Sequence, residues 1–205
     1  MEFRALEEKT VWRGFLHLKR YRLEHQCFSG GWCPPVVRER VEGNHAVSVL
    51  LYDPAADQVV LIEQFRVGAM GHLPSPWLLE TVGGYCELGE TPEAVARRES
   101  MEEAGCEPYE LISIGTLFSS PGWSSERLTF YCGLVESEGV GGIHGLAEEG
   151  EDIRVVVMPA EAAIGELFQR ANSTSIVVTL QWLAANRKRL RRQGSATSNP
   201  VQWRP

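Results

Sequence analysis

The 205-residue sequence lacks an apolar run long enough to span a bilayer, and no secretory signal opens it. Its first eight residues carry four charged side chains where a signal peptide would need an apolar segment. We therefore expect a cytoplasmic protein that has no membrane partner.

Cysteine is scarce, and no two cysteines form a C-x2-C pair. An odd number of cysteines in a protein expected in the cytoplasm predicts reduced thiols. A nucleophilic role for Cys86 is disfavoured because no histidine lies near it in the sequence. The five cysteines are Cys27, Cys33, Cys86, Cys106 and Cys132.

Basic residues are outnumbered, with 20 Lys and Arg against 27 Asp and Glu, which gives a net charge of −7. This balance argues against a nucleic-acid partner, since domains that bind nucleic acid are usually basic. A basic cluster at residues 187–192 is better explained by cations that complement the end of a helix. The negative charge is also unfavourable for an anionic substrate unless the protein recruits cations.

Hydrophobic periodicity predicts one main domain of mixed α/β architecture, with helices on both sides of a sheet. We expect an N-terminal β segment at 1–43, the main domain at 44–193 and a loose tail at 194–205. Helices are predicted at 92–104 and at about 159–170. A last helix is predicted to begin near Asn172 and to continue through 176–192. Strands are predicted as two short strands within 11–25, then at 34–42, 46–52, 58–65, 77–82, 110–117, 128–135 and 153–158.

The most informative segment is residues 84–106, a glycine-containing loop followed by a helix. Thr91 and Pro92 predict the start of the helix and Gly105 its end. Glu99 and Glu103 lie four residues apart and therefore on the same helix face. The pair suits Mg²⁺, with Mn²⁺ as a substitute, although a solvated acidic face is the simpler alternative. Met101 is expected to face the core.

The spacing within this segment is G-x5-E-x7-R-E-x2-E-E-x-G, and every fixed position is filled. It resembles the Nudix box of hydrolases that cleave a nucleoside diphosphate linked to another group. The resemblance implies a Nudix-type α/β/α sandwich of the α+β class. Ser100 and Cys106 depart from the aliphatic preference of the box, at positions expected to pack. The fixed residues are Gly84, Glu90, Arg98, Glu99, Glu102, Glu103 and Gly105.

A second acidic cluster lies at 148–152, in a glycine-rich loop. Alone it would be interpreted as an exposed loop. Beside a metal-binding helix, it can supply a base and a further ligand, since diphosphate hydrolysis needs an aligned water and cations on the phosphate oxygens.

Segments beyond the box resemble bacterial ADP-ribose pyrophosphatases, and the likeness runs from about residue 11 to about residue 185. The resemblance implies Mg²⁺-dependent hydrolysis of ADP-ribose to AMP and ribose 5-phosphate. It also implies a homodimer with exchanged N-terminal sheets, so that each site borrows residues from the partner. The segments are 12–15, 63–66, 76–80, 120–122, 125–127, 142–147 and 151–154.

The resemblance assigns roles by matching position. Glu149 matches the catalytic base, Glu102 an accessory carboxylate, and Arg98 a residue that orients the box glutamates. The implied metal ligands are Glu99, Glu103, Glu151 and the carbonyl of Gly83. The adenosine half is approached by Phe15, Arg38 and Glu39. The other implied substrate contacts are Arg66, Tyr85, Ser120, Pro121, Gly122 and Glu126.

Two positions depart from those relatives. Where this sequence has Gly43 they carry a basic residue, and where it has Gly83 they carry alanine. Phe15 could instead be a packed strand aromatic, and Arg38 and Arg66 could be surface ion-pair partners. The alternative functions are hydrolysis of another nucleoside diphosphate sugar, such as GDP-mannose, and a non-catalytic ADP-ribose sensor. Loss of box glutamates would favour the sensor, and this sequence keeps them.

Overall fold

The computed structural model describes residues 1–72 and 74–197, so 198–205 of the predicted tail lie outside the described residues. Contacts divide the chain into two compact units. The first comprises Met1–His45 and Thr116–Leu128, and the second comprises Ala46–Gly115 and the chain from Thr129 onward. Within the described residues, no helix is both long and apolar enough to cross a membrane.

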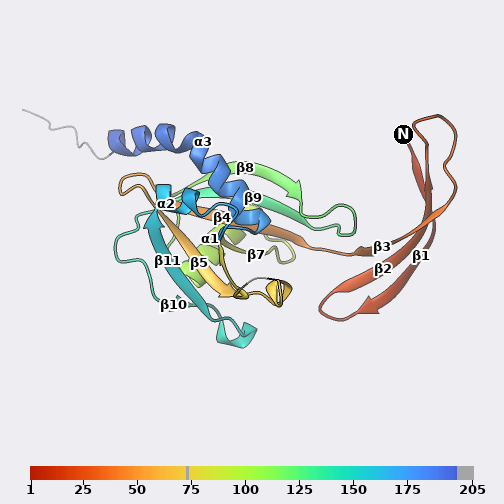
Figure 1. The fold of residues 1–205 in the computed structure, drawn as a ribbon, viewed down its shortest axis with the longest axis horizontal. Helices are drawn as coiled ribbons and strands as arrows, with labels where there is room; N and C mark the ends of the chain where they lie inside the picture. Colours follow the sequence, from red (N-terminus) through yellow and green to blue (C-terminus); the bar gives the residue numbers. More distant parts are fainter. Residues whose placement is uncertain (73, 198–205) are drawn as a thin grey trace, which may run out of the picture. The chain divides into compact units, whose positions relative to one another are not determined.

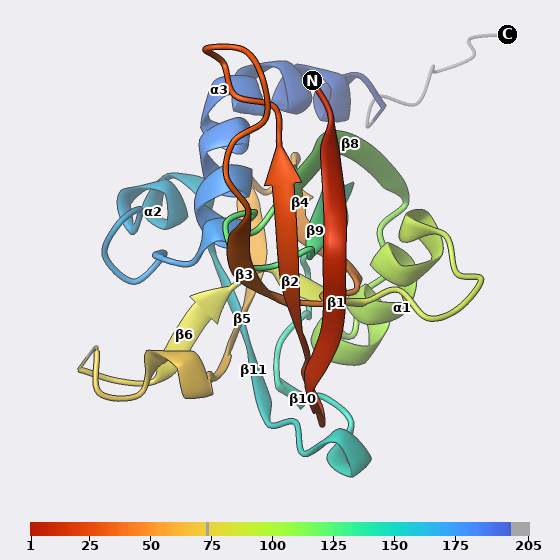
Figure 2. The same cartoon turned by 90° about the vertical axis from the view of Figure 1, so that its right-hand side faces the viewer.

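The first unit contains a three-stranded antiparallel sheet (Figure 2). Its strands are β1 (Phe3–Arg13), β2 (His17–His25) and β3 (Val36–Val41), with β2 in the centre. The prediction of two short strands was wrong in length, because β1 begins at Phe3 and pairs with β2 as far as His25. Cross-strand ion pairs accompany this register, including Lys19 with Glu8 at 2.5 Å.

The turn region after β2 carries a disulfide between Cys27 and Cys33, whose Cα atoms lie 5.3 Å apart. The expectation of reduced thiols is therefore wrong for this pair. The other three cysteines are free, and Cys106 is buried at the packing position expected for it. Sequence spacing gave no sign of the bond because the chain reverses between the two cysteines, where Cys27 N–H donates to the carbonyl of Gly31.

The second unit is built on an eight-stranded sheet, whose main path runs β10-β11-β5-β4-β9-β8 (Figure 1). Strand β6 pairs with β5, and β7 pairs with β4. The predicted strand at 77–82 is thus two strands, and the loop at 139–152 contains the short strand β10. The strands are β4 (His45–Asp53), β5 (Gln58–Phe65), β6 (Trp77–Glu80), β7 (Val82–Tyr85), β8 (Glu110–Phe118), β9 (Arg127–Leu134), β10 (Ile143–His144) and β11 (Ile153–Pro159).

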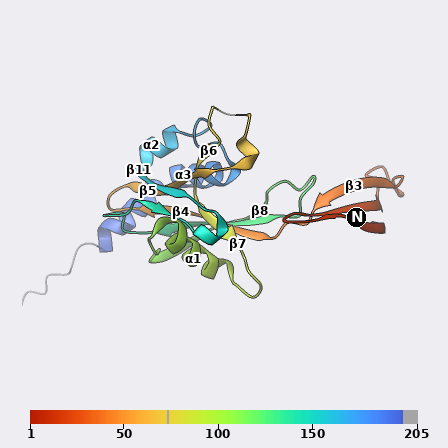
Figure 3. The same ribbon diagram turned by 90° about the horizontal axis from the view of Figure 1, so that it is seen from below.

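Strand β4 is apolar on both faces, so both faces of the sheet are covered. Val47, Val49 and Leu51 enter one core, whereas Leu50 and Tyr52 enter the other. Figure 3 shows α1 on one side of the sheet and α2 and α3 on the other. The helical residues of the two cores are Val95, Ala96 and Ala104 in the first, and Ala160, Ala163, Ile176, Leu180, Leu183 and Leu190 in the second. The fold is the expected α+β sandwich with helices flanking the sheet.

Helix α1 (Pro92–Ala104) confirms its predicted bounds. Thr91 Oγ1 accepts from the Ala94 N–H at 3.2 Å, and Gly105 adopts φ 64° at the other end. Ser100 is fully buried and donates its hydroxyl to the Ala96 carbonyl, as a packing position should.

Two other helix predictions need correction. Helix α2 (Ala160–Gly165) ends well before 170, because Phe168 takes a left-handed conformation with φ 64° and the chain turns there. Helix α3 (Thr174–Thr197) runs past 192 into the segment predicted to be a loose tail. Two short 3-10 helices, η1 (Val67–Ala69) and η2 (Ala147–Glu149), complete the elements.

Candidate active site

The site begins where β7 leads into α1 through a close approach of strand and helix. A Cβ at Gly84 would overlap the Glu99 carboxylate, so glycine leaves this side chain in the position where Arg98 binds it. A larger residue at Gly84 would displace the Glu99 side chain. A Cβ at Gly83 would overlap the Val47 carbonyl oxygen. Glycine therefore allows β7 to pair closely with β4 at this point.

Arg98 holds three box carboxylates together. Its guanidinium donates to both oxygens of Glu90, at 3.1 and 3.2 Å. It also donates to Glu99 Oε1 at 2.8 Å and to Glu102 Oε2 at 2.9 Å. Hydrogen bonding to Glu90 is the main cause of the raised pKa of Arg98. Arg98 therefore orients the acidic helix face.

Glu103 points into the protein, contrary to the expectation for that helix face. It is 2% exposed, and its Oε2 accepts from the Gly83 N–H at 2.8 Å. Burial raises the pKa of Glu103 to about 8, and the charges of Glu99 and Glu151 add to the effect. Burial also raises the pKa of Glu99.

Met101 lies on the opposite side of the helix and is 48% exposed. The expectation that it faces the core was wrong. The reason is that the carboxylate face of α1 is the face turned toward the protein.

The second acidic cluster is attached to the end of α1. The Gly145 N–H donates to the Glu102 carbonyl at 3.2 Å, and the His144 ring lies so close that a Cβ at Gly105 would contact it at 2.6 Å. Glu151 Oε2 in turn accepts from the Leu146 N–H at 3.0 Å. Sequence-distant carboxylates are thereby brought near one another within one unit.

Glu149 ends η2, two residues before Glu151. Its side chain lies outside the described part of the structure, so the backbone alone places it beside the cluster. Its neighbour Glu148 is exposed.

These carboxylates suit a hard divalent cation by donor type, since Mg²⁺ and Mn²⁺ prefer oxygen ligands. Burial is the main cause of the raised pKa values of Glu99 and Glu103, and neighbouring carboxylate charges add to it, so a bound cation would stabilise their ionised forms. Among the described side chains, no three from Asp, Glu, His and Cys already form a metal-binding group. Glu99 is bonded to Arg98, and Glu103 to the Gly83 N–H, through one oxygen each.

Arg66 and Tyr85 belong to the second unit, which also contains the box carboxylates. Arg66 donates to Glu80 at 2.7 Å, which confirms the ion pair considered for it, and it also lowers the pKa of Glu103. Tyr85 is 46% exposed at the end of β7, and its carbonyl accepts from Arg98 at 3.4 Å. Both positions adjoin the strands that flank the acidic cluster.

The remaining candidates lie in the first unit. Phe15 lies in the turn between β1 and β2 and is 94% exposed, so it is not a packed strand aromatic in the described chain. Arg38 donates to the neighbouring Val37 carbonyl, and Glu39 accepts two bonds from Arg20. Among the described residues, Arg38 thus forms no ion pair.

The segment between β8 and β9 carries the last group of candidates. Its turn is closed by Ser120, whose carbonyl accepts from the N–H groups of Trp123 and Ser124. A Cβ at Gly43 would lie 2.7 Å from the Glu126 nitrogen, so a larger side chain has no room there. The departure at Gly43 is thus linked to the backbone position of Glu126. The predicted contacts in this segment are Ser120, Pro121, Gly122 and Glu126.

Sequence reasoning missed some positioning residues. Glu90 was only a motif position, yet it is the main partner of Arg98. His144 and Gly145 hold the second acidic loop to α1, although the segment 142–147 entered the sequence analysis only as a likeness. The φ of +98° at Gly145 explains its glycine, since a Cβ there would also contact Glu151.

Comparison with known proteins shows the family to which the chain belongs. A family model described as NUDIX domain matches residues 44–180, and the chain belongs to the Nudix family.

Similar proteins include two ADP-ribose pyrophosphatases, a GDP-mannose pyrophosphatase and one solved structure. An ADP-ribose pyrophosphatase of Haemophilus influenzae is 43% identical over 189 residues, which cover 90% of this chain and 87% of that protein. An ADP-ribose pyrophosphatase of Escherichia coli K12 is 41% identical, with 92% and 90% covered. A GDP-mannose pyrophosphatase of Citrobacter koseri is 34% identical over 132 residues, covering 62% and 66%. A crystal structure of an ADP compounds hydrolase shares the fold, with a TM-score of 0.65 at 21% identity over 91% of this chain and 96% of that one.

We predict that Glu103→Gln stabilises the metal-free protein at pH 8 and leaves its stability at pH 4 nearly unchanged. Because the pKa of Glu103 is raised by folding, the folded state binds the proton more tightly than the unfolded state. Wild-type stability should therefore fall as pH rises from about 4.5 to about 8, whereas glutamine mimics the protonated form. Urea unfolding should show a gain on the order of 2 kcal/mol at pH 8.

The control is Glu107→Gln, a change at an exposed residue that should move stability little at either pH. Equal stability of wild type and Glu103→Gln at pH 8 would contradict a buried, charge-crowded carboxylate.

Proposed function

We propose that this protein is a cytoplasmic, Mg²⁺-dependent ADP-ribose pyrophosphatase that hydrolyses the diphosphate of its substrate to AMP and ribose 5-phosphate. The observation that carries the proposal is the attachment of the second acidic loop to α1 through Gly145 and Glu102. The contact supports the proposal because the candidate base, Glu149, belongs to the loop that it attaches to α1. The relatives at 41–43% identity support ADP-ribose as the substrate.

In this proposal the cation is held by Glu99, Glu103, Glu151 and the Gly83 carbonyl. A bound divalent cation neutralises the diphosphate oxygens and lowers the pKa of water. Arg98 keeps Glu99 and Glu102 in place through the bonds described above.

The proton chemistry is assigned to Glu149, which accepts the proton of the attacking water. Its position two residues from Glu151, on a loop fixed to α1, supports this assignment. Glu102 has an accessory role, since its side chain is already bonded to Arg98 and its carbonyl to Gly145.

Substrate selection is assigned to residues outside the box. Phe15, Arg38 and Glu39 would approach the adenosine half, supplied across a homodimer. The high exposure of Phe15 in the single chain supports a partner there. The other assigned contacts are Arg66, Tyr85, Ser120, Pro121, Gly122 and Glu126.

We expect ADP-ribose to be turned over fastest in a panel of nucleoside diphosphate sugars with Mg²⁺, because relatives at 41–43% identity are ADP-ribose pyrophosphatases. GDP-mannose is the second candidate, supported by the relative at 34% identity. The panel would be measured as released phosphate-ester product, with Mn²⁺ and metal-stripped samples alongside. A higher kcat/KM for GDP-mannose would overturn the choice, and absence of turnover for every substrate would favour the sensor.

We expect Glu149→Gln to lower kcat by roughly two to four orders of magnitude while ADP-ribose binding persists, because glutamine cannot accept the proton. Glu148→Gln is the matched control, with the same chemical change one residue away, and should stay near wild type. Steady-state kinetics and calorimetric binding of ADP-ribose separate the two effects. Wild-type turnover in Glu149→Gln would refute this base.

We also predict a dimer by light scattering, with sites that combine residues of two chains. Arg38→Ala and Glu103→Gln should each be nearly inactive alone. When the two variants are mixed and allowed to exchange subunits, about a quarter of wild-type activity should return, since half of the dimers regain one complete site. No recovery after proven exchange, or a fully active monomer, would contradict shared sites.

A further inference from the structure

Helix α3 carries Arg187, Lys188, Arg191 and Arg192 on successive turns, before its end at Thr197. The explanation offered by the sequence, that these cations complement the helix end, is wrong. The last turn of the helix contains no basic residue, and the helix dipole acts within the first or last turn. The helix end therefore does not explain the position of this basic cluster.

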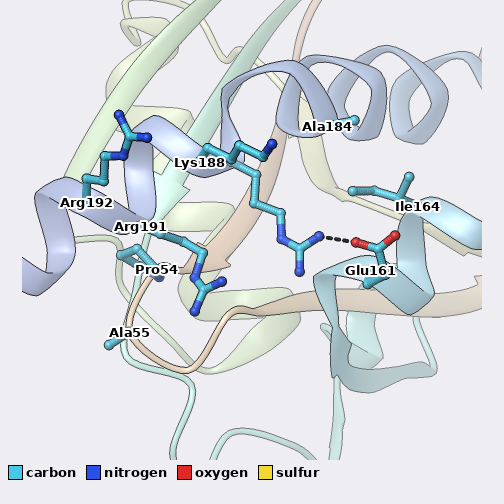
Figure 4. A pocket seen from close by; sticks show the side chains of 9 residues that line it. Pro54, Ala55, Glu161, Ile164, Ala184, Lys188, Arg191 and Arg192 are labelled. Atoms are coloured by element: carbon cyan, nitrogen blue, oxygen red, sulfur yellow. Dashed lines mark hydrogen bonds and ion pairs between the residues drawn. The ribbon is translucent and has the colours of Figure 1, made fainter.

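The basic side chains border a cavity of about 780 Å³ within the second unit. Figure 4 shows it from close by, with Arg191 extending toward the turn that carries Pro54 and Ala55. Small-molecule sites have volumes of roughly 300–1,000 Å³, so this cavity can hold more than an inorganic ion. The lining residues are Pro54, Ala55, Glu161, Ile164, Ala184, Arg187, Lys188, Arg191 and Arg192.

The carboxylates near this cavity are bound mainly to Arg187. Asp57 accepts two bonds from the Arg187 guanidinium, at 2.8 and 2.6 Å, and a third from the Tyr52 hydroxyl at 2.9 Å. These bonds, above all those from Arg187, lower the pKa of Asp57. Glu161 pairs with Arg187 as well, as the dashed line in Figure 4 marks. Arg187 is therefore a structural residue that ties α3 to the rest of the unit.

Among the described residues, Lys188 and Arg191 have fewer acidic partners than Arg187. Arg191 has one contact of 3.3 Å, to the Asp57 oxygen that Arg187 already binds. Lys188 is exposed, and among the described residues it forms no ion pair. Two positive charges thus border the cavity with little compensation in a chain whose net charge is −7.

We propose that this cavity binds a small phosphate ester, with its phosphate at Lys188 and Arg191 and its apolar part against Ile164 and Ala184. Charge-assisted bonds from lysine and arginine are the usual means of holding phosphate. A cavity with an apolar wall suits a small ester better than a nucleic-acid strand, which the negative charge of the chain would also repel. None of these residues belongs to the carboxylate site, so the inference is independent of the proposed function.

The test is calorimetric titration of phenyl phosphate into the full chain, after divalent metals have been removed on a chelating resin. We expect saturable binding, and weaker binding of glycerol 2-phosphate, which lacks the apolar ring. Lys188→Gln should weaken phenyl phosphate about tenfold by loss of a charge-assisted bond.

Arg189→Gln is the matched control, because it removes one positive charge from the same helix outside the cavity lining. Arg189 is bonded to Asn186 and Gln193 instead. Its affinity for phenyl phosphate should stay within about twofold of wild type.

Equal weakening by both variants would overturn the proposal in favour of general charge attraction. Unchanged affinity in Lys188→Gln, or no saturable binding, would also overturn it. Tighter, Lys188-dependent binding of a single-stranded 20-nucleotide DNA would show a nucleic-acid surface instead. Circular dichroism should confirm that both variants fold, since both positions are exposed.

Discussion

Electrostatic crowding beside β7 is the constraint on which the candidate site depends. Folding buries Glu103 and brings Glu99 and Glu151 near it, although each carboxylate would be better solvated in the unfolded chain. Arg98 and the Gly83 N–H compensate only part of this charge. The metal-free site therefore lowers the free energy of unfolding. Cation binding should raise it, so that binding and stability are thermodynamically coupled.

The local parts of this arrangement follow from sequence. Thr91, Pro92 and Gly105 act through bonds and torsions within one or two turns, so the bounds of α1 could be predicted closely. The long apolar strands of the sheet were also predictable, because β4 and β5 are buried on both faces. The prediction for Met101 was wrong because it assigned helix faces by hydrophobicity, whereas this helix buries Glu103 and leaves Met101 exposed.

The parts that could not be predicted depend on contacts between distant segments. Neither the bond from Gly145 to the Glu102 carbonyl nor the room required at Gly84 for Glu99 has a local sequence signal. The left-handed torsion at Phe168, which ends α2 early, is similarly unusual for an aromatic residue. The interpretation of the basic cluster of α3 was wrong because the helix continues past residue 192 to Thr197, so the cluster does not lie in its last turn.

The division of the chain has a consequence for how such enzymes diversify. All candidate metal ligands lie in the second unit, whereas Phe15, Arg38 and the Ser120 segment lie in the first. The family model likewise begins at residue 44, after the N-terminal sheet. The residues proposed to hold the cation and those proposed to approach the adenosine half can therefore accumulate mutations separately. A lineage could exchange one nucleotide preference for another by remodelling the first unit while the hydrolytic carboxylates stay unchanged.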